Sequence, residues 1–127
     1  MGVIGMKFLK NLKVRHDFEY ISTDRKSLFD SKYPGGVRIC EHLKIDDKLS
    51  LSVQASESHY CTPRAYLPLE EYEDFELALI YMGELTEDMS LIKDFPKYDE
   101  LMEYFNYGVF GFVPKDLIED LYTYLLK

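Results

Sequence analysis

The chain has 127 residues, 46% of them hydrophobic, and 23 acidic against 15 basic residues give a net charge of −8 at pH 7. This length and composition predict one globular domain, residues 1–127, and exclude an intrinsically disordered chain. A membrane-spanning helix is also excluded, because no apolar run approaches the roughly 18 residues that a span needs.

We expect no targeting signal in the N-terminal segment. Residues 1–16 lack the unbroken apolar stretch and the small-residue cleavage site of a signal peptide, and position 6 is not the Ser or Thr of a myristoylation motif. We therefore expect a cytoplasmic protein, inside a host bacterial cell, in which Cys40 and Cys61 are reduced thiols. The same segment carries four basic residues, Lys7, Lys10, Lys13 and Arg15.

The charge is unevenly distributed along the chain. Residues 1–64 hold 11 basic and 8 acidic groups, whereas residues 65–104 hold 2 basic and 12 acidic groups. Because phosphate binding depends on Lys and Arg, the acidic middle segment argues against direct nucleic-acid binding. It would instead attract a basic partner surface, or serve only to keep the protein soluble.

The first predicted elements are a short helix and a β-hairpin. Residues 22–30 favour a helix capped by Ser22 or Thr23, and the Pro-Gly-Gly at 34–36 ends it with a turn. Residues 37–45 and 49–56 then predict two strands around a turn at 46–48, since 49–56 alternates apolar and polar residues.

The second half of the chain predicts a strand at 73–82, followed by two helical stretches. Thr86 is the expected cap of the first, with Glu87 and Asp88 in its first turn, and Pro96 suits the first helical position of the second.

Residues 107–113 predict a further strand, with Val109, Gly111 and Val113 facing away from Phe110 and Phe112. The clearest helix of the chain follows Pro114, and its apolar stripe consists of Leu117, Ile118, Leu121, Tyr122, Leu125 and Leu126. We predict an α+β fold, with an antiparallel sheet of about four strands packed by C-terminal helices.

Two Cys/His pairs raise the question of a metal site. Cys40 and His42, and likewise His59 and Cys61, are two residues apart, which puts each pair on one side of a strand, and four such ligands suit zinc. The predicted hairpin argues against this site, because it places Cys40 opposite Val53 and leaves His59 and Cys61 well beyond the pairing. We therefore expect no metal and no cofactor.

The segment that follows the hairpin favours a structural turn over a catalytic centre. A Cys61 nucleophile with His59 or His42 as its base would need a third group to orient the base and an oxyanion loop, and no Gly-rich loop of that kind lies nearby. We expect Ser56, His59, Cys61, Pro63 and Arg64 to form a strand-ending turn. In this turn Cys61 is a buried apolar residue, and Arg64 pairs with one of the acids at 70–73.

Three stretches also carry a resemblance. They are "SVQASESHYCTPR", "YEDFELAL" and "YGVFGFVPKDLIEDL", within residues 51–66, 72–80 and 107–122. Their order resembles a family of small uncharacterised phage and prophage proteins of Gram-positive bacteria. The chain departs from it at Phe110-Gly111-Phe112, where a Tyr-rich version is expected. Residues 1–48 look like an N-terminal extension to the family's core, and 83–104 like a longer insert.

The resemblance implies a mobile-element setting rather than a reaction. By analogy with small acidic phage proteins, we expect a non-catalytic accessory protein that binds and inhibits a host protein. The most plausible target is a nucleic-acid-handling defence enzyme such as a CRISPR nuclease, whose basic channel would attract an acidic protein. The expected partner-binding residues are Glu70, Glu71, Glu73, Asp74, Glu87 and Asp88. The alternative is a small Cys/His enzyme or zinc protein that uses His59 and Cys61.

Overall fold

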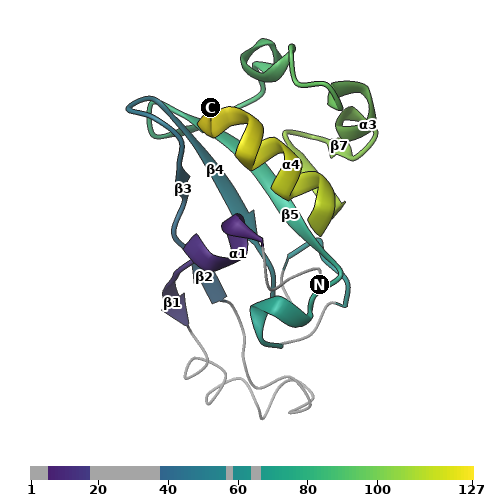
Figure 1. Cartoon of the computed structure of the whole chain (residues 1–127). Coiled ribbons are helices and arrows are strands. Elements are labelled where there is room, and N and C mark those ends of the chain that lie inside the picture. Colours follow the sequence, from purple (N-terminus) through teal and green to yellow (C-terminus); the bar gives the residue numbers. More distant parts are fainter. Residues whose placement is uncertain (1–5, 18–37, 57–58, 64–66) are drawn as a thin grey trace.

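The computed structural model of the chain describes residues 6–17, 38–56, 59–63 and 67–127 (Figure 1). Its helices are α1 (Lys7–Asn11), α3 (Tyr98–Met102), α4 (Lys115–Leu126) and the short 3-10 helices η3 (Leu69–Glu71) and η4 (Met89–Ile92). Its strands are β1 (Val14–Asp17), β2 (Arg38–Cys40), β3 (Leu43–Lys44), β4 (Leu49–Gln54), β5 (Asp74–Tyr81), β6 (Glu84–Thr86), β7 (Phe105–Asn106) and β8 (Val109–Pro114). The helix predicted over 22–30 and the turn over 34–36 lie outside the described residues.

Six strands form an antiparallel sheet in the order β3-β4-β5-β8-β7, with β6 paired to β5 beside this path. β1 and β2 form a separate two-stranded ribbon. The predicted α+β class, with an antiparallel sheet and a C-terminal helix, is confirmed. The sheet has six strands rather than about four, because β6 and β7 are too short to show an alternating pattern. Within the described part of the chain, every helix is too short or too polar to span a bilayer.

The predicted hairpin forms only between β3 and β4, because the strand expected over 37–45 is interrupted at residues 41–42 and its first part, β2, pairs with β1. The register of the hairpin also differs by one residue from the predicted one. Leu43 rather than His42 lies opposite Leu51. The turn is held by Asp46, whose Oδ1 accepts hydrogen bonds from the N–H groups of Lys48 (2.8 Å) and Leu49 (2.7 Å). These bonds lower the pKa of Asp46, because they stabilise its charged form.

A side chain joins β2 to β4. Gln54 Oε1 accepts from the Cys40 N–H at 2.8 Å, and Gln54 Nε2 donates to the Cys40 carbonyl at 3.0 Å. The amide of Gln54 therefore makes the two hydrogen bonds that a neighbouring strand would otherwise offer. This contact was not predicted, because a Gln in an alternating strand is indistinguishable from a solvent-facing residue.

The two faces of the sheet have different compositions. The core face consists of Leu49, Leu51, Val53, Phe75, Leu77 and Leu79, all of them buried. The second face consists of Ser50, Ser52, Gln54, Glu76, Ala78 and Ile80.

Helix α4 lies across the core face (Figure 1). It buries Leu117, Ile118, Leu121 and Tyr122 there, as its apolar stripe predicted, whereas Leu126 is 43% exposed. Phe8 of α1 meets Phe75 edge-on, with ring centroids 5.5 Å apart. Part of the predicted N-terminal extension therefore belongs to the core; the division into domain and extension stays a prediction.

Strand β8 contains a bulge. Phe75 lies opposite Val113 but Leu77 lies opposite Phe110, so Gly111 and Phe112 together face one residue of β5. Phe112 adopts a left-handed backbone conformation (φ 60°). The predicted strict alternation is therefore wrong: Phe110 and Val113 are both buried, and Phe112 is 44% exposed.

The segment between β6 and β7 has less helix than predicted. Asp88, not Thr86, is the residue whose side chain caps η4, by accepting a hydrogen bond from the N–H of Ser90, the second residue of the helix. Thr86 belongs to β6, and its Oγ1 accepts a hydrogen bond from the N–H of Asp88. Pro96 precedes α3, which begins at Tyr98. Ile92, Phe95 and Leu101 are buried, so tertiary packing rather than helical periodicity holds this segment.

Candidate functional site

The six acidic residues predicted to bind a partner fall into two groups. Glu70 and Glu71 lie in η3, and Glu73 and Asp74 follow at the start of β5, where Asp74 is opposite Pro114. Glu87 and Asp88 follow β6, and the carboxylate of Glu87 lies beside Gly108, at the other end of β8. The length of β8 separates the groups by roughly 16 Å. They are therefore two patches rather than one.

Two of these acids are engaged by the fold. Asp88 caps η4, and Asp74 is only partly exposed, with one buried carboxylate oxygen, Oδ1, that has no hydrogen-bond partner among the described residues. Burial raises the pKa of Asp74, and hydrogen bonds from Thr62 offset this only partly. The exposed acids Glu70, Glu71, Glu73 and Glu87 form no ion pair within the described residues.

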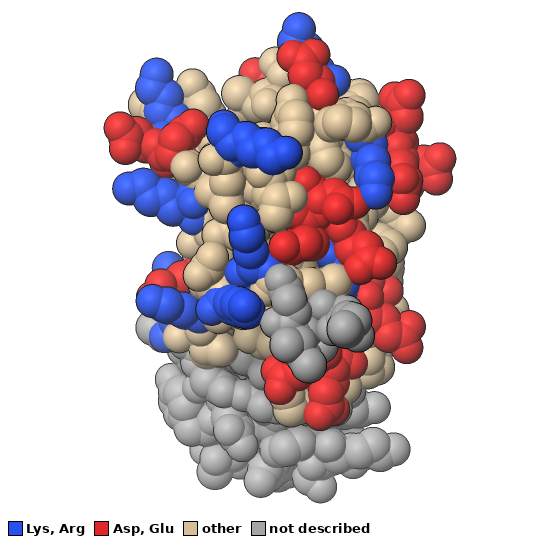
Figure 2. Space-filling model, viewed as in Figure 1, with Lys and Arg blue, Asp and Glu red and all other residues tan. Residues whose placement is uncertain are grey.

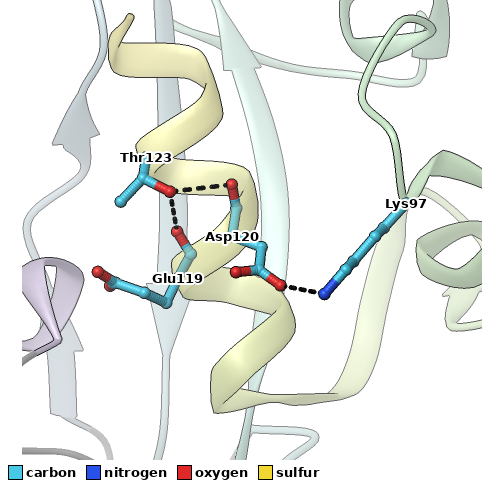
Figure 3. A network of polar contacts seen from close by, with 4 residues as sticks. All are labelled: Lys97, Glu119, Asp120 and Thr123. Carbon is cyan, nitrogen blue, oxygen red and sulfur yellow. Dashed lines mark hydrogen bonds and ion pairs between the residues drawn. The ribbon is translucent and has the colours of Figure 1, made fainter.

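The acids of α4 serve the fold instead (Figure 3). Glu119 accepts hydrogen bonds from the N–H groups of Lys7 (3.0 Å) and Phe8 (3.1 Å), so its carboxylate caps the start of α1. Asp120 pairs with Lys97, which raises the pKa of that lysine. Thr123 Oγ1 donates to the carbonyls of Glu119 and Asp120.

The charges are also segregated in space. Figure 2 shows acidic side chains along the right-hand edge, beside α3 and α4, and basic side chains mostly on the left, over α1 and the β3–β4 hairpin. Such a separation of charge orients the approach of a charged partner.

The segment predicted as a turn is tightly bonded. The His59 N–H donates to the Ser56 carbonyl at 3.2 Å, and Ser56 Oγ and His59 Nδ1 share a hydrogen bond of 2.7 Å. Cys61 Sγ donates to the Ser56 carbonyl at 3.2 Å and to the Pro63 carbonyl at 3.5 Å. Arg64 lies outside the described residues, so its predicted ion pair stays a prediction.

The geometry of this segment offers little to a substrate or a metal. Ser56 is fully buried and Cys61 is 1% exposed, so neither nucleophile is accessible. The side chain of His42 is exposed at the surface. Its pKa is lowered, mainly by partial desolvation of the imidazole and, to a smaller extent, by the positive charge of Arg15. Among the described residues, no group of three or more His, Cys, Asp or Glu is arranged to hold a metal ion.

Two shallow grooves lie beside this segment. The first, which we call the aromatic groove, has a volume of about 620 Å³ and is lined by Tyr60, Glu103, Tyr104, Phe105, Asn106, Val109, Gly111 and Phe112. The second is smaller, about 240 Å³, and includes His59, Ser52, Gln54 and Glu76 of the second face. Val109 lines both grooves, so the two grooves are neighbours on the surface.

Sequence reasoning missed the aromatic groove. Its lining comes from two parts of the chain that are far apart, Tyr60 and residues 103–112, and Phe112 reaches it only because of the bulge in β8. The available signal is the Tyr- and Phe-rich stretch from 104 to 112, which the sequence analysis divides between the end of a helix and a strand over 107–113. Aromatic residues in such numbers are also typical of binding surfaces.

Comparison of the chain with protein-family models, with curated proteins and with solved structures finds no match. The resemblance to a phage and prophage family therefore stays a prediction that rests on the quoted residues.

Proposed function

We infer that this protein is a non-catalytic accessory protein of a phage or prophage that acts in the bacterial cytoplasm. It would bind a host protein with a basic surface and inhibit it, most plausibly a nucleic-acid-handling defence enzyme such as a CRISPR nuclease. The observation that carries this proposal is the set of exposed acids on and after η3, Glu70, Glu71 and Glu73. These acids form no ion pair within the described residues.

Charge without an internal partner favours an external one. A carboxylate with a partner in the same molecule, such as Asp120 beside the exposed Lys97, is largely neutralised, whereas unpaired carboxylates repel their neighbours and contribute mainly to association. A basic nucleic-acid channel has the complementary potential. Inhibition would follow if the acidic patch occupied that channel and kept nucleic acid out.

The test is a cleavage assay with a purified CRISPR nuclease of a Gram-positive host. We expect the protein to inhibit DNA cleavage, and its affinity for the nuclease to fall about tenfold or more between 50 and 300 mM salt. The triple variant Glu70→Lys/Glu71→Lys/Glu73→Lys should lose inhibition. Asp74 is left unchanged, because reversing a partly buried charge would disturb the fold.

A matched control reverses the same number of charges elsewhere. Glu41, Asp47 and Glu84 are exposed and lie outside the patch, so Glu41→Lys/Asp47→Lys/Glu84→Lys changes the net charge equally. This control should keep most of its inhibition. Equal effects of the two triple variants would mean that only net charge matters, and inhibition that survives the first variant would refute the acidic patch.

A further inference from the structure

The aromatic groove has the composition of a recognition site. Tyr60 and Phe112 are 47% and 44% exposed, and their ring centroids lie 5.9 Å apart. Tyr104 and Phe105 complete the apolar lining. Aromatic side chains exposed together in one groove are uncommon on a surface that contacts only water, and they are enriched where proteins bind.

The groove is held in place by the fold. The Phe112 N–H donates to the Tyr60 carbonyl at 3.0 Å, and the Gly111 N–H donates to the Tyr104 carbonyl at 3.1 Å. Tyr60 packs directly over Gly111, where an added Cβ would lie 3.2 Å from the Cβ of Tyr60. The rings are therefore attached to a fixed backbone, which reduces the entropy lost on binding.

The backbone conformation of Phe112 explains how its ring comes to line the groove. A left-handed conformation is sterically costly for a bulky residue, and Asn or Gly would adopt it more easily. At this position the side chain is partly exposed and contributes less to the core than its buried neighbour Phe110 does. The bulge in β8 thus accounts for the position of this ring, and it leaves the ring partly exposed in the aromatic groove.

The charge of the lining selects the ligand. Among the described residues that line the groove, Glu103 is the one charged residue, and it follows α3, whose first turn carries the acids Asp99 and Glu100. Aromatic faces attract cations, and a carboxylate pairs with the guanidinium of arginine. A nucleic acid could stack on the same rings, but its phosphates would meet Glu103 unfavourably.

We propose that the aromatic groove binds an extended, arginine-bearing segment of a basic protein partner, with the guanidinium against Tyr60 and Phe112 and paired with Glu103. This inference rests on the proposed function, because it names the surface that would recognise the partner of the acidic protein. It adds a specific contact to the long-range attraction of the acidic patch.

The test uses the full chain and short peptides, observed by two-dimensional NMR. The probe is acetyl-Thr-Val-Arg-Val-Thr-amide, and the matched probe replaces arginine by citrulline, which keeps the shape but has no charge. We expect the arginine peptide to shift the amide signals of residues 103–106 and 109–112, and the citrulline peptide to bind about fivefold to tenfold more weakly.

Two variants test the lining, each with a control. Phe112→Asn removes the ring at a position whose backbone Asn tolerates, and Met82→Asn makes the same replacement at another left-handed residue, outside the groove. Glu103→Gln removes the charge of the lining, and Glu100→Gln removes a charge next to it. The two groove variants should weaken the arginine peptide about fivefold or more, and the two controls less than twofold.

Three outcomes would overturn the inference. They are no groove shifts at 5 mM peptide, equal shifts from both peptides, and larger groove shifts from a ten-residue thymidine oligonucleotide than from the arginine peptide. Failure of the proposed function would give a different result. If the protein binds the arginine peptide but inhibits no nuclease, the proposed role of the groove is supported and the proposed inhibitor function is refuted. The triple charge reversal at η3 should leave peptide binding within twofold.

Discussion

The two faces of the sheet differ in what their side chains contribute. On the core face Leu51, Val53 and Leu77 are fully buried under α4, and their apolar contacts stabilise the fold. The second face carries Ser, Gln and Glu beside Ala78 and Ile80 and lines the smaller groove, which meets the aromatic groove at Val109.

The bulge in β8 connects these two faces. It lets Phe110 and Val113 both enter the core and turns Phe112 out into the aromatic groove. One extra residue in a strand thus adds to the core and supplies a ring for the binding surface. The comparison teaches that stability and recognition are assigned to opposite faces, and the following predictions test that division.

The largest expected effect is on the core face. Leu121 is fully buried, so Leu121→Ala should lower the free energy of unfolding by about 3 kcal/mol through lost contacts and a cavity. Urea denaturation followed by circular dichroism measures it. Leu126→Ala, at an exposed position of the same helix, should cost less than about 0.5 kcal/mol. Similar costs for the two variants would refute the placement of α4.

A smaller loss is expected where the second face joins β2. Gln54→Leu keeps the size of the side chain but removes both hydrogen bonds to the Cys40 backbone, which should cost about 2 kcal/mol. The comparison is Ser50→Ala on the same strand, which should be nearly neutral. Hydrogen exchange of the Cys40 amide should also accelerate in the Gln54 variant; an unchanged rate would contradict this role.

The turn between β7 and β8 should become more stable when its aromatic residue is removed. Tyr107 and Gly108 both have positive φ (52° and 92°), as in a type I′ turn, for which Asn-Gly is preferred, and Tyr107 is 95% exposed. Tyr107→Asn should therefore raise the free energy of unfolding by about 0.5 to 1 kcal/mol. Tyr107→Val should lower it, because a β-branched residue resists this conformation. If thermal denaturation shows that the Tyr107→Val variant is more stable than the Tyr107→Asn variant, this turn conformation is contradicted.

The smallest effect depends on pH and concerns Asp74. Its pKa is raised above the usual 3.8, so the folded state holds the proton more tightly, and stability falls as pH rises from 3.8 through the raised pKa. Asp74→Asn abolishes this loss, so its advantage should be absent at pH 3 and present at pH 7. Denaturation at both pH values measures it, with Glu84→Gln, at an exposed position beside the other end of β5, as the control. An advantage for Asp74→Asn that is equal at both pH values would exclude the titration.

Much of the fold is predictable from local pattern. The alternation over residues 49–56 and 73–82 predicts β4 and β5, and the apolar stripe after Pro114 predicts α4, because each pattern follows from the geometry of a single element. The acidic segment and the buried Cys61 could also be predicted, since they depend on composition and on residue type.

The candidate site could be predicted only in part. The acids at 70–73 were identified as candidates for an exposed surface, but the separation of Glu87 and Asp88 from them depends on how β6 and β8 pair with β5. The aromatic groove could not be predicted, because Phe112 leaves the expected side of its strand when its N–H bonds to the carbonyl of Tyr60, 52 positions earlier in the chain.

The sequence by itself therefore determined the elements, the α+β class and the acidic character, all of which follow from short-range periodicity and charge. The register of the hairpin and the bonding of Ser56, His59 and Cys61 depend on local hydrogen bonds that the residue pattern does not specify. Tertiary structure alone decided the bulge and the groove. The physical reason is that these features arise where distant backbone groups satisfy one another's hydrogen bonds, and no local pattern of side chains records that choice.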